Sequence, residues 1–347
     1  MIVDNYAFTL IRIGFLKQLI MDEITLKKLE EVNEIKELTE FIRTYYPGFS
    51  PNAYTIEEIE RELFHTYIKL IGKILYISPR NMRIFLKNYL IKYEIMNIKR
   101  IILGTILGMN IKEKSQLVNK LVEKYLDKTD FINELIEISS LDEIRLFMRS
   151  TKYNKAIREG ILYFKKTNEI FVLEAFLDQF YYENLKNEMN ILALKERVMI
   201  SLYLKYISEI YNLNTIYRGI KNNIDRNLLS QFLVESYLFF NENIMKDLLS
   251  LRNVDDFISN INQHLIKTKE VKSYLRKFNL DKNHLIWSIE KLYLEYFFNQ
   301  LEIKIDDIDY QSIFKILEVL IKKDKEIRLY ILPKVVEVLH EKYKRIK

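Results

Sequence analysis

The side chains best suited to bind a metal ion or to move a proton are four histidines, His65, His264, His284 and His340. None lies three or four residues from another, which is the spacing that places two imidazoles on one face of a helix. The chain has no cysteine, so thiolate zinc sites, disulfides and a cysteine nucleophile are excluded. We therefore interpret the histidines as ordinary surface or half-buried residues and expect neither a metal nor a cofactor.

Motifs for phosphate binding and nucleophilic catalysis are also missing. Gly72-Lys73 is followed by Ile74, and no glycine precedes it at the distance that a Walker A loop requires. No Gly-x-Ser-x-Gly motif is present. Acidic residues three or four positions apart are frequent, but such pairs are typical of solvated helix faces. We expect no catalytic residues and a protein that is not an enzyme.

A short polar block recurs along the chain. Glu94-Ile95-Met96-Asn97 is followed 115 residues later by Glu209-Ile210-Tyr211-Asn212, and 117 residues after that by Glu326-Ile327-Arg328-Leu329. The first block leads to Gly104 and the second to Arg218-Gly219. Asparagine is unfavourable inside a helix, so its repetition suggests a role for the polar positions beyond helix formation.

A second block recurs in the same order. Residues 29–38, 135–144 and 248–257 share one pattern of apolar, polar and acidic positions, at offsets of 106 and 113 residues. A fixed period is the sequence mark of a duplicated structural unit. Two blocks in three copies predict a tandem triplication, with helical repeats over residues 1–115, 116–230 and 231–347.

Composition favours long helices joined by short connections. The 347 residues include only 7 glycines and 4 prolines, and no run alternates with the period of a β-strand. The most apolar of the runs without charge, Ile101–Ile111, has eleven residues, whereas a membrane-spanning helix needs about 20. The start of the chain has no signal-peptide pattern. A net charge of +6 permits an acidic partner or a lipid surface without requiring either.

Apolar periodicity and capping signals predict an all-α protein. Thr55–Glu58 and Ser140–Glu143 fit capping boxes, Pro47–Asn52 reads as a loop, and Pro333 is expected to kink or delay the last helix. Helical segments are predicted over residues 6–30, 55–75, 78–104, 154–166, 169–187, 192–218, 226–243, 254–264, 281–300, 309–322 and 324–345, with a short helix opening at Ser140.

Tyrosines are interleaved with basic residues, as in Tyr89–Tyr93 and Tyr203–Tyr206. Such rings could stack on the bases of a single-stranded nucleic acid. They could equally lie at the edge of a helical core, where ring and hydroxyl both find suitable surroundings. We favour the core interpretation, because no basic stripe stands apart from acids, and keep a helical scaffold or nucleic-acid-binding protein as the alternative function.

Several stretches resemble one known family. They are Tyr6–Arg12, Leu177-Asp178-Gln179-Phe180-Tyr181-Tyr182, Asn212-Leu213 with Arg218-Gly219, and Lys325-Glu326-Ile327-Arg328. In order and spacing they are similar to the C subunit of the A-type and V-type rotary ATPases, which is known as the d subunit in the vacuolar enzymes. The chain departs from the family pattern at Leu103, where the second copy has Arg218, and at Leu329 and Pro333 in the third copy.

The resemblance implies a funnel of three similar helical repeats with pseudo-threefold symmetry. It implies a non-catalytic rotor component, peripheral on the cytoplasmic face of the membrane, that links the central-stalk subunits to the proteolipid ring and transmits torque for ion transport. No nucleic acid is expected as a partner. Whether the complex makes or hydrolyses ATP, and whether it moves protons or sodium ions, stays open. The residues expected to line the socket for the stalk are Glu94, Asn97, Glu209, Asn212, Arg218, Glu326 and Arg328.

Overall fold

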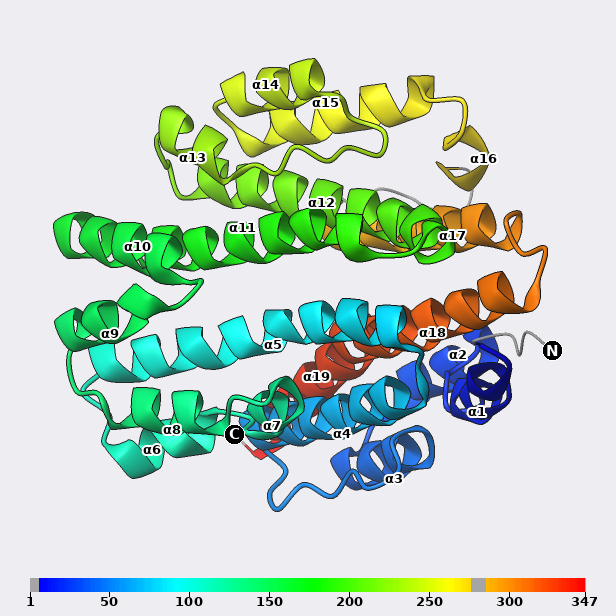
Figure 1. The fold of residues 1–347 in the computed structure, drawn as a ribbon, viewed down its shortest axis with the longest axis horizontal. Helices are drawn as coiled ribbons and strands as arrows, with labels where there is room; N and C mark the ends of the chain where they lie inside the picture. Colours follow the sequence, from blue (N-terminus) through cyan, green and yellow to red (C-terminus); the bar gives the residue numbers. More distant parts are fainter. Residues whose placement is uncertain (1–5, 276–284, 347) are drawn as a thin grey trace. The chain divides into compact units, whose positions relative to one another are not determined.

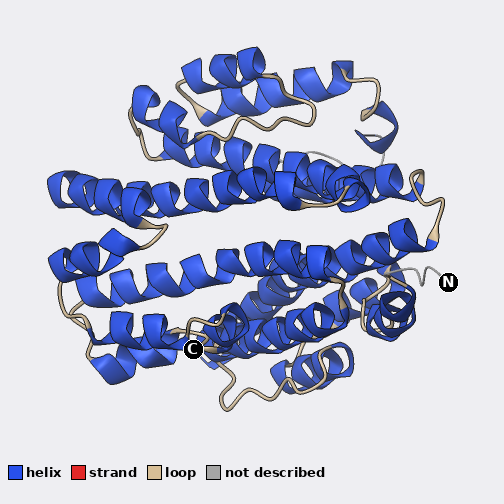
Figure 2. Cartoon of the chain, in the orientation of Figure 1, coloured by secondary structure: helices blue, strands red, loops and turns tan. Residues whose placement is uncertain are grey.

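The computed structural model describes residues 6–275 and 285–346. Within these ranges every regular element is a helix and none is a strand (Figure 2). The all-α prediction is therefore confirmed for the described part of the chain. The helices belong to two compact units, and the long helix α5 (Arg80–Ile106) contributes to both (Figure 1).

The first unit combines the two ends of the chain, residues 1–87 and 305–347, with residues 119–129. Its core forms where α1 packs on α18 and α4, and where α19 packs on α3 and α4. Besides the start of α5, its helices are α1 (Ala7–Lys17), α2 (Glu23–Glu31), α3 (Ile35–Tyr45), α4 (Ile56–Ile77), α7 (Leu121–Leu126), α18 (Ile308–Lys325), the π-helical segment η3 (Glu326–Ile331) and α19 (Leu332–Ile346).

The second unit holds residues 88–118 and 130–304. In it, α10 packs on α11, and α12 packs on α17. Besides the rest of α5, its helices are α6 (Ile111–Leu117), α8 (Thr129–Glu137), α9 (Leu141–Phe147), η1 (Met148–Ser150), α10 (Asn154–Thr167), α11 (Ile170–Glu188), η2 (Met189–Ile191), α12 (Leu194–Lys221), α13 (Arg226–Phe232), α14 (Glu242–Ser250), α15 (Val254–Lys267), α16 (Lys272–Leu275) and α17 (Leu285–Glu302). The predicted division into three repeats stays a prediction.

One helix pair recurs three times along the chain. Helices α2, α8 and α14 each have nine residues, and a link of three residues joins each to the next helix. The following helices begin at Ile35, Leu141 and Val254, which are 106 and 113 residues apart, as the sequence blocks are. We call these pairs (α2–α3, α8–α9 and α14–α15) the helix-pair modules. The equal lengths of the first helices and of the links support the hypothesis of a tandem triplication.

Side-chain caps start the helices where the sequence predicts. The Thr55 hydroxyl accepts a hydrogen bond from the Glu58 N–H at the start of α4, and the Ser140 hydroxyl accepts one from the Glu143 N–H at the start of α9. Both caps satisfy amides that have no partner within their helix. The predicted long helix over residues 192–218 is α12, and the predicted helix over 78–104 is α5. The predicted start at residue 281 lies outside the described residues.

The single helix predicted over residues 226–243 is wrong. Helix α13 ends at Phe232, the chain is not helical from Leu233 to Asn241, and α14 begins at Glu242. The backbone N–H groups in this break bond to side chains of α12, more than 20 residues earlier in the chain. Tertiary hydrogen bonds thus override the local helix propensity.

Pro333 disturbs its helix as expected, and it does so over one widened turn. Residues Glu326–Ile331 are π-helical, and α19 begins at Leu332. Proline has no N–H to give to the carbonyl four residues earlier, that of Leu329, and its ring crowds that carbonyl. A local π-turn is a common way to absorb such a mismatch inside a continuous helix.

Candidate functional site

The seven predicted socket residues fall into two classes. Five are buried, with at most 3% of each exposed: Glu94, Asn97, Glu209, Asn212 and Glu326. The other two, Arg218 and Arg328, keep 43% and 36% of their side chains exposed. The structure thus brings the buried residues into internal contacts, and leaves the arginines with surface that a partner can reach.

Glu209 lies in the middle of α12 and binds the chain break that precedes α14. Its carboxylate accepts hydrogen bonds from the N–H groups of Leu238 (2.6 Å), Phe239 (2.9 Å) and Phe240 (3.0 Å), and from the Tyr293 hydroxyl (2.7 Å). Burial raises the pKa of Glu209 to about 7, although these hydrogen bonds act in the opposite direction. The carboxylate therefore holds a non-helical segment in place.

Asn212, one helical turn later, fixes the other end of the same break. Its amide donates to the Val234 carbonyl and accepts from the Val234 N–H, both at 2.9 Å. This pairing satisfies a buried backbone position that has no helical partner. Glu209 and Asn212 together determine the path from Leu233 to Asn241.

Glu326, in the π-helical segment, binds residues on both sides of the first helix-pair module. It accepts from the N–H of Met21 (2.8 Å), the hydroxyl of Tyr46 (3.1 Å) and the ammonium of Lys323 (2.6 Å). Lys323 also donates to the carbonyls of Leu19 and Tyr45. Burial raises the pKa of Glu326 and lowers the pKa of Lys323 to about 8.

The three glutamates each bind next to a helix-pair module. Glu94 accepts from the hydroxyl of Tyr153, which follows the second module. Glu209 accepts from Phe240 and Glu326 from Met21, each the residue directly before the N-cap of a module. Each glutamate therefore binds a residue that flanks a helix-pair module: Glu94 binds one beyond the second module, Glu209 one before the third, and Glu326 one before the first.

The arginines lie near the helix ends with partial internal pairing. The Arg218 guanidinium is 3.6 Å from the Glu174 carboxylate and 4.6 Å from the ring centre of Phe171. The Arg328 guanidinium donates to Asp324 at 2.9 Å. These contacts hold the guanidinium groups in position while leaving part of each accessible.

Sequence reasoning missed one exposed surface. Phe8, Ile11 and Phe15 of α1 are 57%, 67% and 63% exposed. Helix α1 contains no acidic residue and carries Arg12 and Lys17. Helical spacing identified these apolar residues as one face of a helix, but periodicity does not reveal whether a neighbour covers that face. A stripe of large apolar side chains at the surface is a feature of interaction sites.

The tyrosines considered for base stacking are buried. Tyr89, Tyr93, Tyr203 and Tyr206 are each at most 4% exposed. Their rings pack together in the second unit, with Tyr89 6.3 Å from Tyr203 between ring centres. They contribute to the core, as the favoured interpretation expected, and offer no stacking surface.

The described residues contain neither a metal site nor a membrane-spanning helix. Over 6–275 and 285–346, no group of three or more His, Asp or Glu side chains could hold a metal ion. His264 faces the carbonyl of Phe239 at 2.9 Å, and His284 lies outside the described residues. No helix in the described part combines the length and the apolar character needed to cross a membrane.

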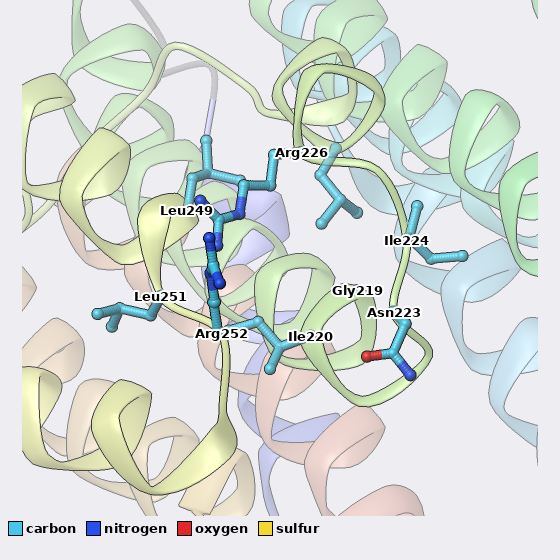
Figure 3. Close-up of a pocket in the computed structure, with 9 residues that line it drawn as sticks. Gly219, Ile220, Asn223, Ile224, Arg226, Leu249, Leu251 and Arg252 are labelled. Atoms are coloured by element: carbon cyan, nitrogen blue, oxygen red, sulfur yellow. The ribbon is translucent and has the colours of Figure 1, made fainter.

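A pocket of about 240 Å³ opens at the C-terminal end of α12 (Figure 3). Gly219 lets the Leu229 side chain pack directly on α12, because a Cβ at this position would lie 2.3 Å from Cδ1 of Leu229 and that side chain would have to move. The residues that line the pocket are Gly219, Ile220, Asn223, Ile224, Arg226, Leu229, Leu249, Leu251 and Arg252.

Comparison with known proteins decides the family. The family model described as ATP synthase (C/AC39) subunit matches residues 12–329, nearly the whole chain. The chain belongs to this family. The match includes both sequence blocks and all seven predicted socket residues, so the resemblance drawn from short motifs is confirmed over most of the chain.

Relatives within the C/AC39 family are C subunits of A-type ATP synthases. The one from Methanocaldococcus jannaschii is 24% identical over 308 residues, covering 81% of this chain and 75% of that protein. The one from Thermococcus kodakarensis is 21% identical over 315 residues, covering 88% and 80%. The one from Pyrococcus furiosus is 24% identical over 214 residues, covering 60% and 55%, so that match spans about half of its length.

Proposed function

We propose that the chain is a non-catalytic central-stalk subunit of an A-type or V-type ATPase. In this role it links the central stalk to the membrane proteolipid ring, transmits torque for ion transport and lies on the cytoplasmic face of the membrane. Support comes from membership of the C/AC39 family and from relatives named as the C subunit of A-type ATP synthase. The burial of the interleaved tyrosines favours this role over the nucleic-acid alternative.

The observation that carries the proposal is the recurring contact between a buried glutamate and a residue that flanks a helix-pair module. Glu94, Glu209 and Glu326 each make such a contact, and Glu326 near the end of the chain binds Met21, directly before the first module. A chain whose last repeat holds its first repeat suits a closed threefold arrangement. Such an arrangement provides the funnel that we propose as the socket of a rotating stalk.

Within this proposal the predicted socket residues have two different roles. The buried ones, such as Glu209 and Asn212, position the helix ends, while Arg218 and Arg328 present guanidinium groups to the stalk. We assign contact with the ring to the exposed apolar stripe of α1 (Phe8, Ile11 and Phe15), because its lack of acids and its apolar character suit a surface next to a membrane.

Charge reversal of the two arginines tests the socket. The variants R218E and R328E should each bind purified central-stalk subunits of the same ATPase about tenfold more weakly, because a complementary charge becomes a repulsive one. Binding is measured by biolayer interferometry at two salt concentrations. Glu209 is unsuitable for such a test, since its burial means that reversing its charge would disrupt the fold.

The matched control is R158E. Arg158 is 53% exposed in the same unit as Arg218 and pairs with the adjacent Glu159 at 2.7 Å. It should bind the stalk as the wild type does. Unchanged affinity in both R218E and R328E, with normal unfolding midpoints, would remove these arginines from the socket.

A further inference from the structure

The pocket at the end of α12 brings together two arginines from different elements. Arg226 begins α13 and Arg252 lies in the link between α14 and α15. Figure 3 shows both guanidinium groups within the pocket, directed toward one another. In the part of the chain that the structure describes, neither has a hydrogen bond or an ion pair. Two like charges held together in this way repel each other unless an anion lies between them.

Among the residues that the structure describes, those lining the pocket include no acid to balance these charges. Asp225, the neighbour of Arg226, is engaged as the N-cap of α13, where its carboxylate accepts from the Leu228 N–H at 3.0 Å. The walls are otherwise formed mainly by branched apolar side chains, including Ile220 and Leu249. The pocket therefore combines a cationic pair with an apolar lining.

An equivalent position lies about 115 residues earlier, at the end of α5. Helices α6 and α13 both have seven residues, both start after a side-chain cap, and their starts are 115 residues apart. At this offset Gly104 and Lys114 correspond to Gly219 and Leu229, with the same close approach to the glycine. Lys114 is buried, and its ammonium donates to the Ile138 carbonyl.

The later position thus has an open pocket where the earlier one has the internal contact of Lys114. Leu229 stands where the earlier position has Lys114, and Arg226 and Arg252 stand where it has Ile111 and Ser139. The first change removes a cation that binds within the chain. The second adds two cations that have no acceptor among the described residues of the chain. Such a pair of differences is suited to a ligand from outside the chain.

We infer that this pocket binds a carboxylate presented by another protein of the ATPase. A guanidinium group forms paired, charge-assisted hydrogen bonds with a carboxylate, and the apolar walls accommodate the methylene groups behind it. A volume of about 240 Å³ suits one side chain or chain terminus better than a nucleotide. The inference rests on the proposed function for the identity of the partner.

The chemistry of the pocket is tested on the isolated chain with hexanoate as the probe. Titration is followed by the methyl NMR signals of Ile220 and Ile224, in the wild type and in R226Q/R252Q. Hexanoate should shift the wild-type signals saturably, and the double variant should bind at least about fivefold more weakly. Hexanol, which has a similar chain and no charge, should give no saturable shift. An equal response to hexanol, or an unchanged response in the variant, would overturn the anion site.

The partner is tested by binding the chain to purified ATPase from which this polypeptide has been removed. R226Q/R252Q should bind about tenfold more weakly, while the control R145Q/R158Q, which removes two arginines paired with Asp142 and Glu159, should bind normally. If the wild type binds and R226Q/R252Q binds equally well, the inference is wrong. If the wild type itself does not bind, the proposed function fails, and the hexanoate titration still decides the chemistry of the pocket.

Discussion

Replacing Glu209 with alanine is expected to lower the free energy of unfolding by about 3–5 kcal/mol, since it leaves several hydrogen-bond donors without their acceptor. Those donors are the N–H groups of Leu238, Phe239 and Phe240 and the hydroxyl of Tyr293. The segment that they hold has no helix of its own to satisfy them. Urea unfolding followed by circular dichroism measures the loss. Glu302→Ala, an exposed change at the end of α17, should cost less than about 0.5 kcal/mol.

The contribution of Glu209 to folding stability changes with pH in a direction that follows from its raised pKa. The folded pKa of about 7 exceeds the ordinary value of 4.5, so the folded state holds the proton more tightly than the unfolded chain does. This stabilisation is fully present below about pH 4.5 and is lost as the pH rises through 7, by about 3 kcal/mol in total. The stability difference between the wild type and E209Q, which cannot titrate at this position, should fall over that range. A difference that stays constant with pH would contradict the burial argument.

Replacing Lys323 with methionine is expected to cost about 3–5 kcal/mol, because Glu326 then keeps a buried charge without its cation. Lys323 lies 2.6 Å from Glu326 and is 1% exposed, and its ammonium also lies over the ring of Tyr46. In K323M/E326Q the buried charge is gone, while the glutamine oxygen can still accept from the Met21 N–H. The double variant should therefore be about 2 kcal/mol more stable than the sum of the single changes predicts.

The neighbouring Lys322 is the matched control. It pairs with Glu318 on the same helix and is 35% exposed, so K322M should cost less than about 1 kcal/mol. Additive effects of K323M and E326Q in the urea unfolding cycle would show that Lys323 and Glu326 act independently, contrary to a coupled buried network.

The recurrence of the modules was predictable because its signal is local. It follows from the blocks at residues 29–38, 135–144 and 248–257, and the cap at Ser140 follows from chemistry within a few residues. Their nine-residue first helices were not predicted, because the apolar spacing indicates one helical stretch over residues 6–30 and no helix was expected over 129–137. The break from Leu233 to Asn241 was not predictable in this way. Its residues are largely apolar and read as helix, while the groups that hold it open, Glu209 and Asn212, lie more than 20 residues away.

The same limit applies to the candidate site. A polar residue that recurs on long helices indicates an important position. The sequence pattern is the same whether that residue faces a partner at the surface or binds backbone groups in the interior. Only the partners distinguish Glu209, which binds three backbone N–H groups, from Arg218, which remains partly exposed. The pocket was missed for a related reason: Arg226 and Arg252 are 26 residues apart in sequence, and only the folded chain places both at the same pocket.

The most direct test of the proposed role is to purify the tagged chain from membranes of its own cells under mild detergent and to identify what accompanies it by mass spectrometry. We expect central-stalk subunits and the ring proteolipid in fixed proportion to the tagged chain, and their loss at high salt. Recovery of the chain alone, or with nucleic acid in place of these proteins, would contradict the proposed role.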